Sequence, residues 1–197
     1  MVEGTKSMLI VSQNITNYDI PLPKDAVFRI NLAWVNSIDE LKTILKKHES
    51  HAIFLDFPVN RTKPPNNKYT LNDVVLILQK HNNIKYIAIS NVETETDLDE
   101  YLEIIPNHVT IIPKIESQKG IENIETIVKK LEYKERIIML DHVDLYSDLL
   151  KSNLPPSKFT FFINKLTEFC NSNDIILLRT IGVFFSDEEK RVTEYVN

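Results

Sequence analysis

Short apolar runs alternate along this chain with longer segments whose apolar residues recur every three or four positions. The short runs are rich in β-branched residues, which is typical of strands, and the longer segments have the period of amphipathic helices. The predicted strands cover residues 8–12, 27–31, 52–56, 86–90, 109–115, 136–140 and 175–178. Regular alternation of this kind predicts βαβ units and a parallel sheet.

Helices are predicted between these strands, and two of them have recognisable start signals. Ser37-Ile-Asp-Glu40 has the pattern of a capping box, and Thr70 is placed to cap a second helix. The predicted helices cover residues 37–49, 70–78, 94–105, 118–131, 155–171 and 187–196. Because the strands are almost continuously apolar, we expect helices to cover the sheet.

The pattern predicts an α/β fold, namely a TIM-type (β/α) barrel with parallel strands. A full barrel of this type usually needs about 250 residues, and the chain has 197. The barrel is therefore expected to be short or incomplete, with about seven strands. No repeat or low-complexity linker divides the sequence, so residues 1–197 are predicted to form one domain.

Composition and charge narrow the class of protein. Hydrophobic residues make up 43% of the chain and charged residues 26%, which indicates a folded protein with an ordinary core. The net charge is −5 without a cluster of Lys or Arg, which argues against nucleic-acid binding. No apolar run is long enough for a signal sequence or a membrane span. The single cysteine, Cys170, cannot form an intrachain disulfide, so a cytoplasmic location is expected.

Polar side chains gather where the predicted strands end. Ligands of parallel α/β folds bind at the carboxyl ends of the strands, although any strand that leaves the core must also meet water. The strand-end residues are Arg29, Asn31, Asp56, Ser90, Lys114, Glu116, Asp141, His142, Asp144, Arg179 and Thr180.

These residue types suit the chemistry of a metal-dependent enzyme. Glu116 and Asp144 supply the oxygen ligands that Mg²⁺ or Mn²⁺ prefers. Arg29 is suited to hold a carboxylate or phosphate, and Lys114 is suited to stabilise an enolate or a transferred phosphoryl group. Thr180 is a candidate for relaying a proton.

Several segments resemble, in the same order, those of the pyruvate kinase family barrel. Residues 111–127, with Lys114-Ile-Glu116 at their centre, resemble that family's Lys-Ile-Glu strand and the helix after it. Residues 85–92 resemble its DYIALSFV strand, and residues 138–145 resemble its IMVARGDLG segment. The resemblance extends over roughly residues 8–185 and implies a barrel of the phosphoenolpyruvate/pyruvate superfamily.

The resemblance also implies a role for each matched residue. It matches Glu116 and Asp144 to divalent-metal ligands. The implied catalytic residues are Lys114, Thr180 and Arg29, the substrate-binding residues are Arg29, Ser90 and Asp144, and the monovalent-cation ligands are Asn31 and Asp56.

The chain departs from the family's pattern in three places. Only residues 59–69 stand where the family inserts its lid domain, and the C-terminal domain is lacking. Residues 31–35 lack the family's serine cation ligand, and residues 142–146 lack both of its loop glycines. These losses argue against a K⁺ site and against ordinary nucleotide binding. The metal-dependent aldolases and the citrate lyase β-type lyases of the same superfamily, which have no lid domain, resemble the pattern too.

Two hypotheses from different classes are therefore kept. The first is a Mg²⁺-dependent (or Mn²⁺-dependent) enzyme acting on phosphoenolpyruvate, pyruvate or a related 2-oxo acid, as a pyruvate-kinase-like transferase or as a lid-less aldolase or lyase. The second is a degenerate, non-catalytic barrel that serves as a binding or assembly module, because a missing strand leaves an edge that a second copy can cover. The expected partners are a small carboxylate or phosphate substrate and, in a homo-oligomer, another copy of the chain.

Overall fold

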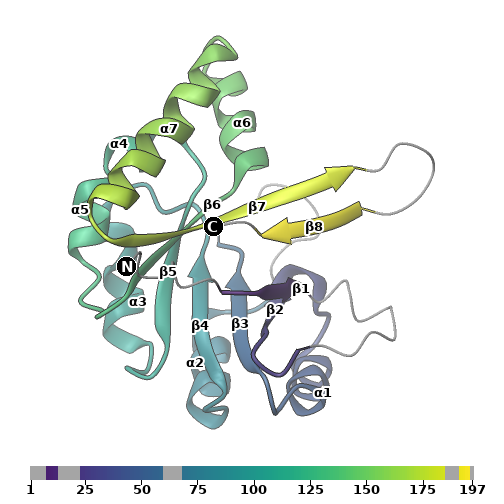
Figure 1. The fold of residues 1–197 in the computed structure, drawn as a ribbon. Coiled ribbons are helices and arrows are strands. Elements are labelled where there is room, and N and C mark those ends of the chain that lie inside the picture. Colours follow the sequence, from purple (N-terminus) through teal and green to yellow (C-terminus); the bar gives the residue numbers. More distant parts are fainter. Residues whose placement is uncertain (1–7, 13–22, 60–67, 185–190, 196–197) are drawn as a thin grey trace, which may run out of the picture.

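The computed structural model describes residues 8–12, 23–59, 68–184 and 191–195, with side chains up to Arg179. One sheet runs through this part of the chain, and its strands lie side by side in sequence order (Figure 1). The strands are β1 (Ile10–Ser12), β2 (Val27–Asn31), β3 (Ala52–Phe57), β4 (Ile84–Ile89), β5 (Thr110–Ile115), β6 (Arg136–Leu140), β7 (Ile175–Phe184) and β8 (Arg191–Tyr195). Strands β1 to β7 pair in parallel, each with its neighbour in sequence, whereas β8 pairs with β7 in antiparallel fashion.

Helices lie between successive parallel strands from β2 to β7. They are η2 (Leu32–Trp34), α1 (Ile38–Lys47), α2 (Leu71–Lys80), η3 (Glu95–Leu98), α3 (Asp99–Ile104), α4 (Gln118–Glu122), α5 (Ile124–Lys129), α6 (His142–Lys151) and α7 (Ser157–Ser172). Two of the predicted start signals are confirmed. The Ser37 hydroxyl accepts a hydrogen bond from the Glu40 amide at 3.1 Å, and Thr70 forms a capping box with Asp73.

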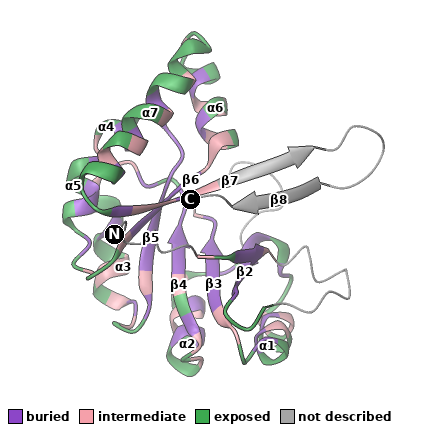
Figure 2. Ribbon diagram, in the orientation of Figure 1, coloured by how far each residue is buried: buried purple, intermediate pink, exposed green. Residues whose placement is uncertain are grey.

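The two faces of the sheet pack differently because successive side chains of a strand point to opposite faces. On one face, residues such as Phe28, Leu55 and Ile87 form a large core with the helices. On the other face, which the helices leave uncovered, a smaller apolar cluster comes almost entirely from strand residues, among them Phe54 and Ile112. Figure 2 shows the resulting distribution, with buried strands inside and exposed residues along the outer sides of the helices. The helix-free face is the inner face of an open half-barrel.

The prediction of an α/β fold with about seven parallel strands is confirmed, in the form of this open half-barrel. The predicted helix over residues 187–196 is wrong, since residues 191–195 form the strand β8. The segment Arg-Val-Thr-Glu-Tyr contains two β-branched residues and an aromatic one, which are common in strands, and its backbone pairs with β7. The first part of that predicted helix, residues 187–190, lies outside the described residues.

Two other helical predictions differ in detail from the structure, and one helix was missed. The predicted helix over residues 118–131 is interrupted at Asn123, whose side-chain amide donates a hydrogen bond to the Glu93 carbonyl at 2.9 Å. The predicted helix over residues 94–105 begins as the 3₁₀ helix η3. Helix α6 was not predicted at all. None of the helices in the described ranges is long and apolar enough to cross a membrane.

Candidate metal centre

The inner face of the half-barrel becomes polar toward the carboxyl ends of β2 to β6. Within one strand, residues two positions apart share a face, so Phe54 is followed on the inner face by Asp56, and Ile112 by Lys114 and Glu116. The inner face therefore carries apolar side chains along the middle of the strands and charged side chains at their carboxyl ends. Carboxyl ends of parallel strands are where α/β folds place ligand sites.

A buried ion network occupies the centre of this polar layer. The carboxylate of Asp56, which is 1% exposed, accepts a hydrogen bond from Arg29 Nη2 through Oδ2. Its Oδ1 atom lies 3.6 Å from Lys114 Nζ. The same ammonium group donates to Ser90 Oγ at 3.1 Å and lies 2.7 Å from Glu116 Oε1. A half-buried arginine and a buried lysine therefore share one buried aspartate, and the lysine also contacts a glutamate.

The network keeps Lys114 and Asp56 charged. Burial by itself would lower the pKa of Lys114, but the carboxylates of Asp56 and Glu116 outweigh it, and the net shift of the pKa is upward. Burial would likewise raise the pKa of Asp56, but Lys114 and Arg29 reverse this effect and hold that pKa below its usual range. Lys114 is therefore a permanent cation and Asp56 a permanent anion at neutral pH.

Glu116 is the link between this network and a second acidic group. Its side chain is buried, with Oε1 on Lys114 and Oε2 accepting a hydrogen bond from the Asn91 backbone amide at 2.6 Å. Burial raises the pKa of Glu116, the charge of Asp141 acts in the same direction, and Lys114 opposes both. A carboxyl group in this position gains from a nearby positive charge, because such a charge offsets the cost of its desolvation.

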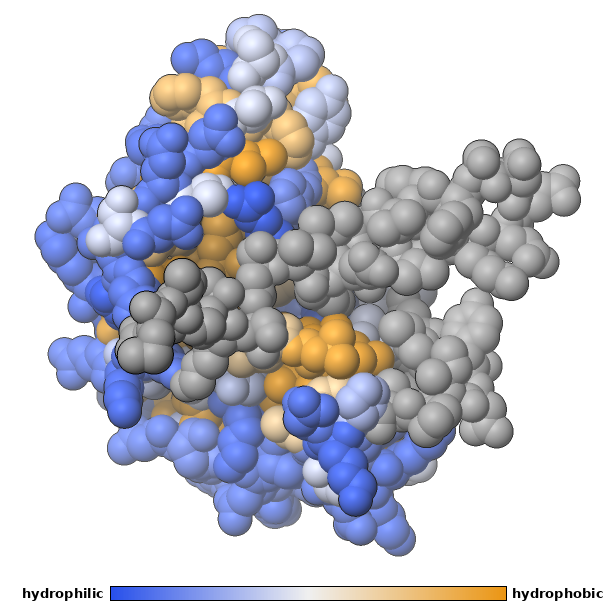
Figure 3. All heavy atoms as spheres, viewed as in Figure 1, coloured by the Kyte–Doolittle hydropathy of each residue, from blue (hydrophilic) through white to orange (hydrophobic). Residues whose placement is uncertain are grey.

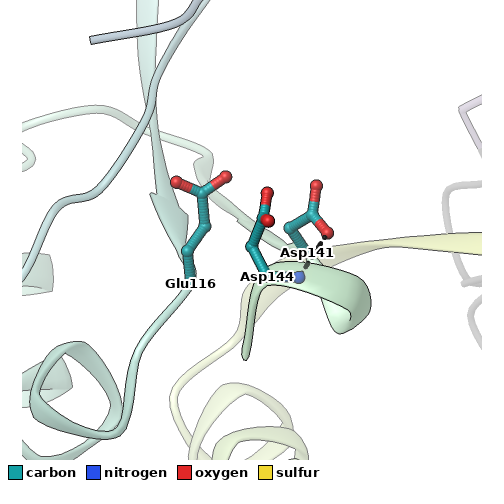
Figure 4. A group of neighbouring side chains, drawn as sticks. All are labelled: Glu116, Asp141 and Asp144. Carbon is teal, nitrogen blue, oxygen red and sulfur yellow. Dashed lines mark hydrogen bonds between the residues drawn. The ribbon is translucent and has the colours of Figure 1, made fainter. Parts of the chain in front are cut away.

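Glu116, Asp141 and Asp144 form an acidic triad at the end of β5 and the start of α6. One carboxylate oxygen from each lies within 4.8 Å of the others, and the three side chains point the same way (Figure 4). Asp141 is the N-cap of α6, where its Oδ1 accepts hydrogen bonds from the amides of Val143 at 3.1 Å and Asp144 at 3.2 Å. The cap orients the first turn of α6 so that Asp144 faces Glu116. Oxygen ligands in this number and spacing suit Mg²⁺ or Mn²⁺.

The combined charge of the polar layer also suits a divalent ion. The four carboxylates outnumber the two cations by two, which leaves a formal charge that one divalent ion would balance. The six groups are Arg29, Lys114, Asp56, Glu116, Asp141 and Asp144.

The other predicted site residues are placed as follows. Asn31 caps η2 through a hydrogen bond from the Ala33 amide to its side-chain oxygen at 3.0 Å, while its predicted cation-binding partner Asp56 faces Arg29 and Lys114. Thr180 belongs to β7 and is paired with Tyr195, but its side chain lies outside the described part. Arg179, one of the strand-end residues, donates a hydrogen bond to Thr167 of α7, so it lies on the helix-covered face of the sheet.

The sequence predicts no role for two residues of the centre. Asp141 stands out from the sequence only as a strand-end residue, yet it completes the triad. Its signal was available, because an aspartate between an apolar strand and a helical segment is a strong N-cap candidate. Asn91 contacts Glu116 through its backbone, and no side-chain pattern reports such a contact.

Comparisons with known proteins show similarity of fold without similarity of sequence. No protein-family model matches the chain, and no curated protein matches it in sequence. The structure of RipC from Yersinia pestis is similar with a TM-score of 0.58 and 16% identity, over 93% of this chain and 77% of that one. A Cryptosporidium parvum pyruvate kinase in complex with ADP is similar with a TM-score of 0.56 and 15% identity, over 78% of this chain and 51% of that one. The chain thus spans about half the length of that pyruvate kinase, and the half-barrel fits a distant pyruvate-kinase-like fold.

Proposed function

We propose that this chain binds Mg²⁺ or Mn²⁺ through Glu116, Asp141 and Asp144 and catalyses enolate chemistry on phosphoenolpyruvate, pyruvate or a related 2-oxo acid. The observation that carries the proposal is the acidic triad, whose oxygens lie within 4.8 Å of one another beside a buried lysine. The position of the triad at the carboxyl ends of β5 and β6 supports the proposal. A bound divalent ion would polarise the substrate oxygens on which negative charge develops.

Lys114 stabilises that negative charge in the proposed reaction. Its ammonium group is held between Asp56 and Glu116, and the raised pKa keeps it protonated. A lysine in this state is a poor nucleophile, so a Schiff base with the 2-oxo acid is disfavoured. The fixed positive charge instead acts by electrostatic stabilisation.

Arg29 and Ser90 form the proposed anion-binding side of the centre. Arg29 is anchored through Nη2 to Asp56, which orients the guanidinium group on the inner face. Ser90 accepts a hydrogen bond from Lys114, which leaves its hydroxyl hydrogen to be donated to an anion. Thr180 is retained as the proposed proton relay on the sequence resemblance alone.

The fold similarity is shared by more than one reaction class. Pyruvate-kinase-like transfer needs a nucleotide, whereas the lid-less aldolases and lyases use the same metal and enolate without one. Only residues 59–69 stand where the kinase lid would be inserted. We therefore propose the metal-dependent enolate step itself and place the aldolase or lyase reaction ahead of phosphoryl transfer.

Calorimetry with Mn²⁺ and oxalate, an enolate mimic, tests this proposal. The parent protein is expected to bind oxalate only when Mn²⁺ is present, and Glu116→Gln should abolish both binding events. Glu125→Gln is the matched control, because Glu125 is an exposed glutamate paired with Lys129 on the surface of α5. If Glu116→Gln binds Mn²⁺ and oxalate as the parent does, the metal assignment is wrong.

The open sheet favours a second candidate function, a non-catalytic barrel used as an assembly module. Among the described strands, β1 is an edge with only β2 as its partner, and such edges are covered by another chain in many proteins. Light scattering at rising protein concentration tests this candidate. A concentration-dependent dimer without any heat of Mn²⁺ binding supports the module, and a strict monomer contradicts it.

A further inference from the structure

We infer that Asn91 is a positioning residue for the metal centre: it holds the Glu116 carboxylate in the orientation that completes the triad. Asn91 directly follows Ser90 at the carboxyl end of β4, and its backbone amide donates a hydrogen bond of 2.6 Å to Glu116 Oε2. Its role as a ligand-orienting residue rests on the proposed function, whereas its contact with Glu116 does not.

The backbone of Asn91 has an uncommon conformation that makes this contact available. Its φ angle is 56°, in the left-handed region that residues other than glycine rarely adopt. Asparagine tolerates this region better than most residues do. Glycine would adopt it easily but would lack the side chain that anchors the turn.

The Asn91 side chain ties the turn to the neighbouring strand. Its Nδ2 atom donates a hydrogen bond of 2.7 Å to the Val59 carbonyl, just beyond the end of β3. On the other side, the Val92 amide donates to the Lys114 carbonyl at 3.2 Å. The turn is thus attached to β3 and to β5, on either side of β4.

Helix α4 packs against the turn from outside the sheet. A Cβ atom on Gly120 would lie 2.7 Å from the Val92 carbonyl oxygen, so the glycine permits a close approach of the helix. The turn therefore has little room to move, and its amide has a fixed direction.

Both oxygens of Glu116 are consequently held. Lys114 contacts Oε1 at 2.7 Å and Asn91 contacts Oε2 at 2.6 Å. With two contacts the carboxylate has one preferred orientation, in which it faces Asp141 and Asp144. Preorganisation by outer contacts of this kind raises the affinity of a metal site.

Metal titrations of backbone variants test the inference. Asn91→Ala disfavours the left-handed turn and removes the tether, and it should weaken Mn²⁺ binding about tenfold. Asn91→Gly restores the turn and its amide, so it should recover most of that affinity. Asn153→Ala is the matched control, because Asn153 also has a left-handed backbone, with φ of 53°, in the turn after α6. That variant should lose stability but keep the parent's Mn²⁺ affinity.

A second readout needs no metal and separates this inference from the proposed function. In the parent, the Asn91 amide proton donates to a charged carboxylate and should give a downfield NMR signal. Glu116→Gln should move that signal upfield, while Glu125→Gln should leave it unchanged. An unchanged Asn91 signal in Glu116→Gln, or full Mn²⁺ affinity in folded Asn91→Ala, overturns the inference. If the parent binds no Mn²⁺, the proposed function fails, and the NMR result alone decides whether Asn91 positions Glu116.

Discussion

Asp56 is the shared counterion of the two cations in the polar layer. Two cations, Arg29 and Lys114, contact its carboxylate, and the carboxylate itself is 1% exposed. Removing one partner from such a group leaves a charge that is neither solvated nor paired. Its first role is therefore structural, whatever ligand the centre binds.

Asp56→Asn is expected to lower the free energy of unfolding by about 3–5 kcal/mol, because both cations lose their shared counterion. Urea unfolding followed by circular dichroism measures the change. Asp39→Asn is the control, since Asp39 pairs with Lys42 on the surface and its side chain is 92% exposed. Equal urea midpoints for Asp56→Asn and the parent would contradict this account of the network.

His48 lies at the opposite end of the strands from the acidic triad. We expect it to make the stability of the protein depend on pH. Its buried ring stacks on Phe28 with 3.7 Å between the ring centroids, and its Nδ1 atom has no hydrogen-bond partner among the described residues. Burial, with smaller effects from His51 and Lys47, lowers the pKa of His48 below 6.5. The unfolded chain therefore takes up this proton more readily than the folded chain, and stability is lost as pH falls below the unfolded value.

The urea midpoint of the parent should accordingly decrease between about pH 7.5 and pH 5.5. His48→Gln should decrease less over the same range, because the titrating group is gone. His81→Gln is the matched control, because His81 ends α2 in the same way as His48 ends α1. A parent and a His48→Gln variant with parallel pH profiles would show that another group is responsible.

Among the elements, α4 shows how a single glycine sets the distance between a helix and a loop. Glycine inside a helix normally costs stability relative to alanine, by roughly 1 kcal/mol. Here the Cβ of an alanine would lie 2.7 Å from the Val92 carbonyl oxygen and 3.3 Å from Ile115 Cγ2. The backbone oxygen cannot move aside without shifting the turn at Asn91.

Gly120→Ala should therefore destabilise the protein, by about 1–3 kcal/mol, where helix propensity alone predicts a gain. Thermal unfolding measures the sign directly. Glu122→Ala, an exposed position in the same helix, should change stability little. A higher melting temperature for Gly120→Ala would show that the helix can move away from the loop.

The elements that sequence patterns missed have physical reasons for being missed. Helix α6 buries Leu145 and Leu149 but leaves Val143 and Leu150 exposed, and its first residues resemble the polar end of the preceding strand. Figure 3 shows hydrophobic side chains among the hydrophilic ones in the region of α6 and α7. The charged residues of β8 favour a helix in the sequence pattern, whereas its strand state depends on pairing with β7.

At the scale of the whole molecule, the acidic triad spans the ends of two neighbouring strands, β5 and β6. Glu116 follows β5, and Asp141 and Asp144 follow β6, so an ion bound to the triad would link β5 to α6. An ion that binds only the folded state stabilises it by mass action.

Mn²⁺ at about 100 times its dissociation constant should raise the free energy of unfolding by about 2.7 kcal/mol. Thermal unfolding with and without Mn²⁺ measures this stabilisation as an increase in melting temperature. The increase should disappear in Asp144→Asn. Asp99→Asn, which changes an exposed aspartate paired with Lys130, should keep the parent's response. An equal shift in Asp144→Asn and the parent would place the bound ion elsewhere.

The sequence by itself determined the α/β class, the seven parallel strands and the polar character of their carboxyl ends. It could do so because strand and helix periods are local, and because parallel strands bring their ends to one edge. It also singled out Lys114, Glu116 and Asp144 before any contact was known. The tertiary structure alone decided that Asp56 pairs with both cations, that Asp141 completes the triad and that Asn91 holds Glu116. These depend on side-chain and backbone atoms from the ends of different strands meeting within 4.8 Å of one another, and no pattern along one strand encodes such distances.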